Sequence, residues 1–224
     1  MTFILKLAAI DEEFISIVNS PQFSRYNAVF DDFMFGVDLR AIILILAYPF
    51  NERFANIDLP ISRKISKFKR RLGMAKVEYE SGISVKGDKK GSSSALARSE
   101  FYMHVCSRYK LLSRRGGSEH PTAIMRQIQE YHDDKEAELR ADPEKLQKRW
   151  EERQRAKIHA AHLSYGLSVP ESLKIIDSMD WTAKAPNAIE KTRLIGDLLI
   201  MRTGAYLCKQ LFKALLDVGP DLDS

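Results

Sequence analysis

The longest apolar stripe of the sequence lies near its C-terminus and requires a helix of about seven turns. Asn187 and Glu190 form a capping box in front of the stripe, and Gly219-Pro220 follows it. A helix of this length is stable when it buries the stripe against other helices, so the fold is expected to be largely helical. The members of the stripe recur at intervals of three and four residues: Leu194, Leu198, Met201, Ala205, Cys208, Phe212 and Leu215.

Other helices are predicted from apolar periodicity and from capping residues. Asp142-Pro143 places a capping carboxylate before a proline at the first helical position. Ser168 and Glu171 form a second capping box. The predicted helices cover residues 24–47, 61–72, 95–112, 121–140, 143–165, 168–179 and 187–219.

The clearest β signal lies between the second and third of these helices. Tyr79 and Ile83 would face each other across the loop Glu80-Ser81-Gly82, and Gly82 supplies the left-handed residue that such a loop needs. A small β-hairpin is therefore expected near residues 75–86. Residues 2–9 fit either a strand or a helix. The predicted fold class is mainly α, with about six to eight helices and one hairpin, and it becomes α+β if residues 2–9 add a strand.

Length and composition restrict the domain organisation and the location. We expect an N-terminal region at 1–117 and a C-terminal helical region at 118–224, which are compatible with one continuous domain. Two cysteines are too few for a disulfide framework. The most apolar run, residues 41–50, spans about 15 Å as a helix, half of a bilayer's hydrocarbon core. We therefore expect a cytoplasmic protein without a membrane partner.

Charge is distributed unevenly along the chain. The formal net charge of +5 resolves into −4 for residues 1–61, +11 for residues 62–115 and −2 for residues 116–224. Such an excess is difficult to neutralise within the chain, because the flanking regions supply too little negative charge. A localised positive field of this kind favours an anionic partner.

The basic region 62–115 is therefore the candidate nucleic-acid-binding site. Each Lys or Arg that neutralises a phosphate releases condensed counterions, which is the main source of non-specific affinity for DNA or RNA. Tyr79, Tyr102 and Tyr109 could stack on unpaired bases. The candidate backbone-binding residues are Arg63, Lys64, Lys67, Lys69, Arg70, Arg71, Lys86, Lys89, Lys90, Arg108, Lys110, Arg114 and Arg115.

Two other interpretations of these charges stay open. The basic face could dock on an acidic protein partner, or it could be an ordinary solvated surface. The loop 87–94 carries two lysines and three serines before a helix, a competent anion site. It lacks the Walker A spacing and is more simply a loop with a serine N-cap.

Evidence for an enzyme is weak. His159 and His162 are three residues apart, but no carboxylate completes a metal motif, and no nucleophile motif is present. No catalytic residue, metal ligand or cofactor is therefore assigned. The corner at 165–168 superficially suggests a helix-turn-helix, but Glu171 and Asp177 on its second helix make a poor DNA-reading surface.

The leading hypothesis is a non-enzymatic accessory subunit or regulator of a nucleoprotein assembly. It would hold the phosphate backbone through residues 62–115, with little reading of base edges. Protein partners in a larger complex are expected as well. The alternative is an adaptor or inhibitor whose basic face docks on an acidic partner.

Overall fold

The structure is a computed structural model that describes residues 3–75, 94–110, 122–181 and 184–218. The mainly α class is confirmed. The described residues contain no strand and form nine α-helices, more than the six to eight expected. The expected hairpin falls on residues that lie almost entirely outside the described ones. A strand at residues 2–9 is wrong, because α1 (Phe3–Val18) is helical from its first described residue.

The chain divides into two compact units, each described here by itself. The first comprises Met1–Tyr131 and Ile200–Ser224, and the second comprises His132–Leu199. Helices α7 (Ala123–Ala141) and α10 (Ala188–Asp217) each contribute residues to both units. The other elements of the first unit are α1, η1 (Pro21–Phe23), α2 (Ser24–Asp32), α3 (Val37–Ala47), the π-helix η2 (Asn51–Ala55), α4 (Ile61–Arg71), α5 (Ala95–Val105) and the π-helix η3 (Cys106–Lys110).

The single helix expected over residues 24–47 is wrong, because the chain turns between α2 and α3. Met34 adopts a positive φ of 52° at this turn. Phe33 and Phe35 are both buried, and their rings stack with centroids 5.3 Å apart. Residues two apart point to different sides of a continuous helix, so burying both rings in one core requires the break.

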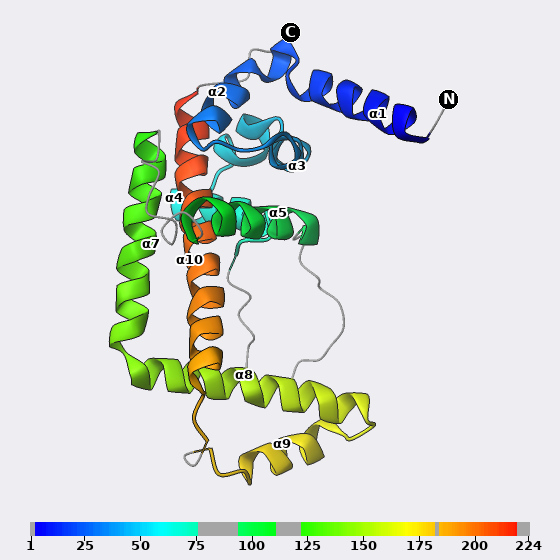
Figure 1. Cartoon of the computed structure of the whole chain (residues 1–224). Helices are drawn as coiled ribbons and strands as arrows, with labels where there is room; N and C mark the ends of the chain where they lie inside the picture. Colours follow the sequence, from blue (N-terminus) through cyan, green and yellow to red (C-terminus); the bar gives the residue numbers. More distant parts are fainter. Residues whose placement is uncertain (1–2, 76–93, 111–121, 182–183, 219–224) are drawn as a thin grey trace. The chain divides into compact units, whose positions relative to one another are not determined.

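Aromatic side chains dominate the core of the first unit. The C-terminal part of α10 supplies Leu207, Leu211 and Phe212, all fully buried. In Figure 1 this part of α10 runs beside α7, and Tyr131 stacks on Tyr206 with ring centroids 4.0 Å apart. The apolar stripe predicted for α10 therefore packs as expected over its C-terminal half.

The second unit contains the helices α8 (Pro143–Ser164) and α9 (Val169–Asp177). As predicted, the Asp142 carboxylate caps α8 and accepts from the Lys145 N–H at 2.9 Å. The Glu171 carboxylate accepts from the Ser168 N–H at 3.0 Å, and the Asn187–Glu190 box forms in the same way. The core cluster of this unit consists of Leu139, Leu146, Trp150, Leu194, Ile195 and Leu199.

No helix among the described residues has both the length and the hydropathy that a bilayer-spanning segment requires.

Candidate nucleic-acid interface

Helix α4 carries six of the thirteen candidate residues and is held in place by one buried aromatic ring. Phe68 is fully buried, and its ring packs against Phe50, Phe54 and Phe212 with centroid distances of 5.8, 5.2 and 5.5 Å. The predicted apolar stripe of α4 faces this cluster through Phe68 and Leu72, although its first member, Ile61, is 54% exposed. The opposite face of α4 is therefore directed to solvent.

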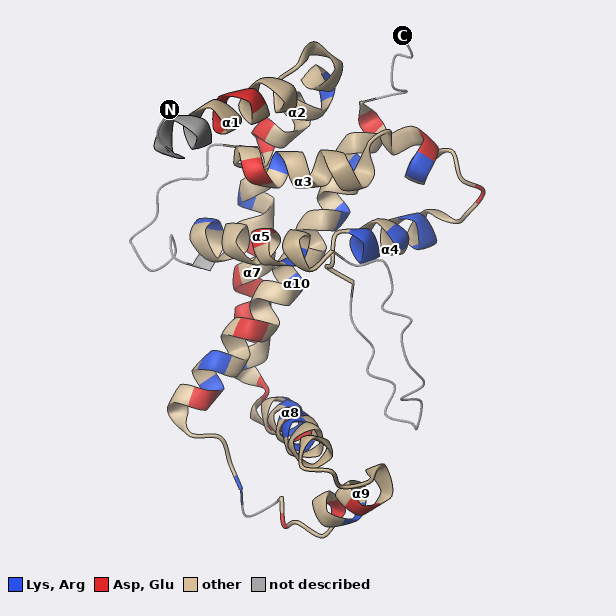
Figure 2. Cartoon of the chain, turned by 90° about the vertical axis from the view of Figure 1, so that its right-hand side faces the viewer, with Lys and Arg blue, Asp and Glu red and all other residues tan. Residues whose placement is uncertain are grey.

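Three cations line the solvent face of α4. Arg63, Lys67 and Arg70 are all exposed, and their i, i+4, i+7 spacing places them within about 60° of arc. We call these three residues the α4 row; it spans about 10 Å along the helix axis at 1.5 Å per residue. Figure 2 shows Lys and Arg gathered along α4, whereas α1 carries acidic residues.

Two lysines of α4 also have a structural role. The Lys64 ammonium donates to the carbonyl of Ala55, and the Lys67 ammonium donates to the carbonyl of Arg53 at 3.4 Å. The Lys67 Nζ lies 5.9 Å from the centre of the Phe54 ring. These contacts attach α4 to the end of η2, where cations are favoured by the unsatisfied carbonyl groups. Lys64 is therefore mainly structural, while Lys67 stays exposed.

The remaining cations of α4 are half-buried. Burial lowers the pKa of the Lys69 ammonium, and nearby Lys209 of α10 lowers it further, whereas Cys208 opposes the shift. The Arg71 carbonyl accepts from the Ser94 N–H at 3.3 Å, which places the start of α5 beside the end of α4. Lys69 and Arg71 are therefore less accessible than the residues of the α4 row.

The cations of α4 have no acidic partners in the part of the chain that the structure describes. Every ion pair found there joins residues elsewhere, as in Arg40–Asp31 and Arg153–Asp197. Glu52 and Asp58 precede α4 by a few residues, and neither forms an ion pair among the described residues. Among the described residues, no carboxylate therefore neutralises the positive charge of the α4 row.

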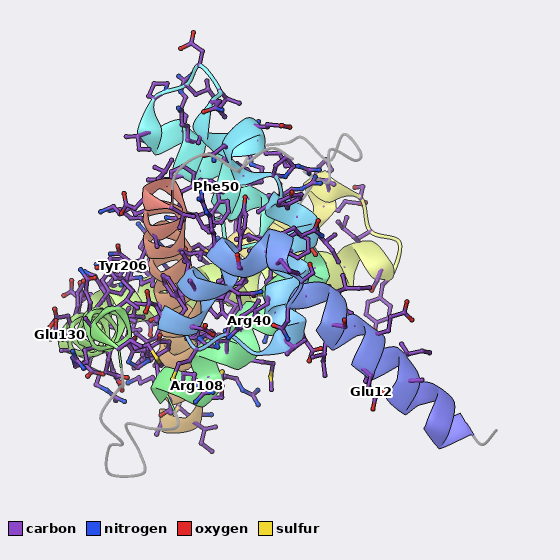
Figure 3. The ribbon with its side chains drawn as sticks, turned by 90° about the horizontal axis from the view of Figure 1, so that it is seen from above. Glu12, Arg40, Phe50, Arg108, Glu130 and Tyr206 are labelled. Atoms are coloured by element: carbon purple, nitrogen blue, oxygen red, sulfur yellow. The ribbon has the colours of Figure 1, made fainter. Side chains whose placement is uncertain are left out.

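The described structure does not place any candidate residue from outside α4 beside the α4 row. Arg108 is half-buried in η3, and Figure 3 shows it well apart from Phe50, the residue whose ring packs on Phe68 of α4. Lys110 is the last residue of η3. Lys86, Lys89, Lys90, Arg114 and Arg115 lie outside the described residues.

Three basic residues near α4 were not among the candidates. Arg53 of η2 is exposed, and its carbonyl accepts from Lys67. Arg98 of α5 donates from Nε to the carbonyl of Gly73 at 2.9 Å, just after α4. Lys209 is close enough to Lys69 to lower the pKa of its ammonium. Their sequence positions carried no signal of this proximity, which arises from packing between distant segments.

The tyrosines proposed for base stacking differ in exposure. Tyr109 is fully buried, so its use as a stacking platform is wrong: its ring fills the core beside His104 instead. Tyr102 is 37% exposed on α5. Tyr79 lies outside the described residues.

His159 and His162 of the second unit have a structural role, since both contact the same buried hydroxyl. The Nδ1 atoms of His159 and His162 lie 2.8 and 3.0 Å from the hydroxyl of Ser172, which is fully buried between α8 and α9. No cluster of three or more potential metal ligands occurs among the described residues. The corner between α8 and α9 is closed by Gly166, with a φ of 87°.

Comparison with known proteins gives no further guidance, since no protein-family model, curated protein or solved structure matches the chain.

Proposed function

We propose that this protein binds nucleic acid through the phosphate backbone and acts as a non-enzymatic accessory subunit or regulator of a nucleoprotein assembly. The observation that carries the proposal is the α4 row. It presents three exposed cations on one helix face, without acidic partners among the described residues. A rigid helix that holds its cations in line loses little conformational entropy when they meet a line of phosphates.

The physical basis of binding is the release of counterions. Each phosphate neutralised by Arg63, Lys67 or Arg70 releases condensed cations, and affinity therefore falls linearly with salt on logarithmic axes. The arginine forks also suit the geometry of phosphate oxygens. Contacts of this kind position a protein on nucleic acid without reading its sequence.

The test compares two variants of equal charge. Arg63→Gln, Lys67→Gln and Arg70→Gln together remove the α4 row. Lys148→Gln, Lys157→Gln and Arg193→Gln remove three exposed cations of the second unit, none of them in an ion pair among the described residues. Gln is tolerated in helices about as well as Lys and Arg. Phe68 and Lys64 still hold α4 when the contacts of Lys67 are lost, so both variants are expected to fold.

Binding is measured by fluorescence anisotropy with a labelled mixture of single- and double-stranded DNA and RNA at 50 mM salt. We call the variant without the α4 row the row variant and the variant of the second unit the control variant. We expect the control variant to bind as the wild type does and the row variant to bind much more weakly. Equal binding by both variants would refute the role of α4. Binding of poly-glutamate by the wild type, with no binding of any nucleic acid, would replace this function with docking on an acidic protein partner.

A further inference from the structure

The aromatic rings around α4 are placed in the core and not on the surface. Phe50, Phe54 and Phe68 are each at most 3% exposed. Among the aromatic residues of the first unit whose side chains the structure describes, Tyr102 is the most exposed, at 37%. Proteins that hold single strands without sequence preference combine a basic groove with successive exposed rings on which bases stack. The described surface around α4 supplies the cations without such a series of rings.

The shape of the α4 row favours a ligand with a dense, regular array of phosphates. The row is straight because it lies on one helix, and that helix is fixed on its inner side by Phe68 and at one edge by Lys64. Along about 10 Å of axis, a duplex presents about six phosphate charges and one of its strands about three. A duplex also keeps its phosphates in fixed positions, whereas a single strand has to be ordered on binding.

We infer that the ligand of the α4 row is the backbone of a double-stranded nucleic acid, bound in preference to a single strand and without sequence selection. This inference rests on the proposed function and specifies its ligand. Arg63, Lys67 and Arg70 would each meet a phosphate.

The size of the preference follows from the salt dependence. Three phosphate contacts give a slope of about −2.7 for duplex DNA and about −2.1 for a single strand. If the affinities for duplex and single strand are equal at 1 M salt, the duplex binds roughly six-fold more tightly than the single strand at 50 mM salt. Between 50 and 200 mM salt, the affinity for the duplex falls by about 40-fold.

The experiment measures binding of the full chain to 20-mers of one sequence: single-stranded DNA, duplex DNA, single-stranded RNA and duplex RNA. Each is titrated by anisotropy at 50, 100 and 200 mM salt with the wild type, the row variant and the control variant. We expect each duplex to bind more tightly than its single strand, with a slope for duplex DNA that is about 3 units shallower in the row variant. The two duplex arms distinguish DNA from RNA, which share the same backbone chemistry.

Four results would overturn the inference in different ways. Row-dependent binding that is equal or tighter for single strands would refute the duplex preference and leave the proposed function intact. Absence of binding to all four probes would refute both. A tenfold loss of affinity on changing Tyr102→Ala would show that base stacking contributes, and competition by one duplex sequence far better than by another would show sequence reading.

Discussion

His104 makes the stability of the first unit dependent on pH. It lies on the inner face of α5, is 8% exposed and has its ring 5.0 Å from that of Phe35. Burial, with a smaller contribution from Arg108, lowers the pKa of His104 from 6.5 to about 4. The folded protein therefore keeps this imidazole neutral at pH values where the unfolded chain protonates it.

The sign and size of the effect follow from linkage. Between pH 6.5 and 4, the unfolded state binds a proton that His104 cannot bind in the folded state, so the free energy of unfolding falls as the pH falls. A pKa difference of about 2.5 units corresponds to about 3 kcal/mol in total. About 2.5 kcal/mol of this is lost between pH 7 and pH 4.5. The loss is a large fraction of the 5–15 kcal/mol that typical domains have.

The measurement is urea denaturation of the wild type and His104→Leu at pH 7 and pH 4.5. Leucine fills the site and cannot be protonated, so the stability of the variant relative to the wild type should rise by about 2.5 kcal/mol on acidification. Other titrating groups are common to both proteins and cancel in the difference. Phe101→Leu, at a neighbouring buried position, is the control: it should lose similar stability at both pH values. A difference between wild type and His104→Leu that does not change with pH would refute the reasoning.

Two further predictions concern backbone conformation and a shared hydroxyl. Gly73 has a φ of 72°, and a Cβ there would lie 2.6 Å from the carbonyl oxygen of Ser94. Gly166→Ala should cost about 1–2 kcal/mol of left-handed strain, because a Cβ there would meet nothing within 4 Å. Gly73→Ala should cost more stability than this, because it adds a clash to the strain. Equal losses of stability in urea denaturation would exclude the clash. Ser172→Ala removes the hydroxyl shared by His159 and His162 and should cost about 1–2 kcal/mol of stability. The loss is measured as faster amide hydrogen exchange in α9. Unchanged exchange would show that the hydroxyl does not hold α9.

Helix boundaries were predictable where capping chemistry is local. Asp142-Pro143 marks the start of α8, and the box of Ser168 and Glu171 marks the start of α9, within a residue or two of the observed bounds. Each signal depends on side chains that bond to backbone groups three residues away, so the sequence alone specifies the geometry. The orientation of α4 was also predictable, because its apolar stripe determines which face of the helix is left for the cations.

Features that depend on packing between distant segments were not predictable. The turn at Met34 forms because Phe33 and Phe35 enter the same core, which helical periodicity alone does not reveal. The contacts of Lys64 and Lys67 with carbonyls of η2 join residues 9 and 14 positions apart. Periodicity could therefore place six cations around α4, but only the tertiary structure shows which of them are exposed and that Lys64 and Lys67 also contact η2.

The ion pairs of the described residues leave the cations of α4 without acidic partners. Asp31 pairs with Arg40 in the first unit and Asp177 pairs with Arg155 in the second, whereas Glu52 and Asp58, which precede α4, form no ion pair among the described residues. Several more pairs are three or four residues apart on a single helix, as in Arg140–Glu136. None of these pairs involves a cation of α4, so the polyanion proposed as its ligand would supply the missing negative charge.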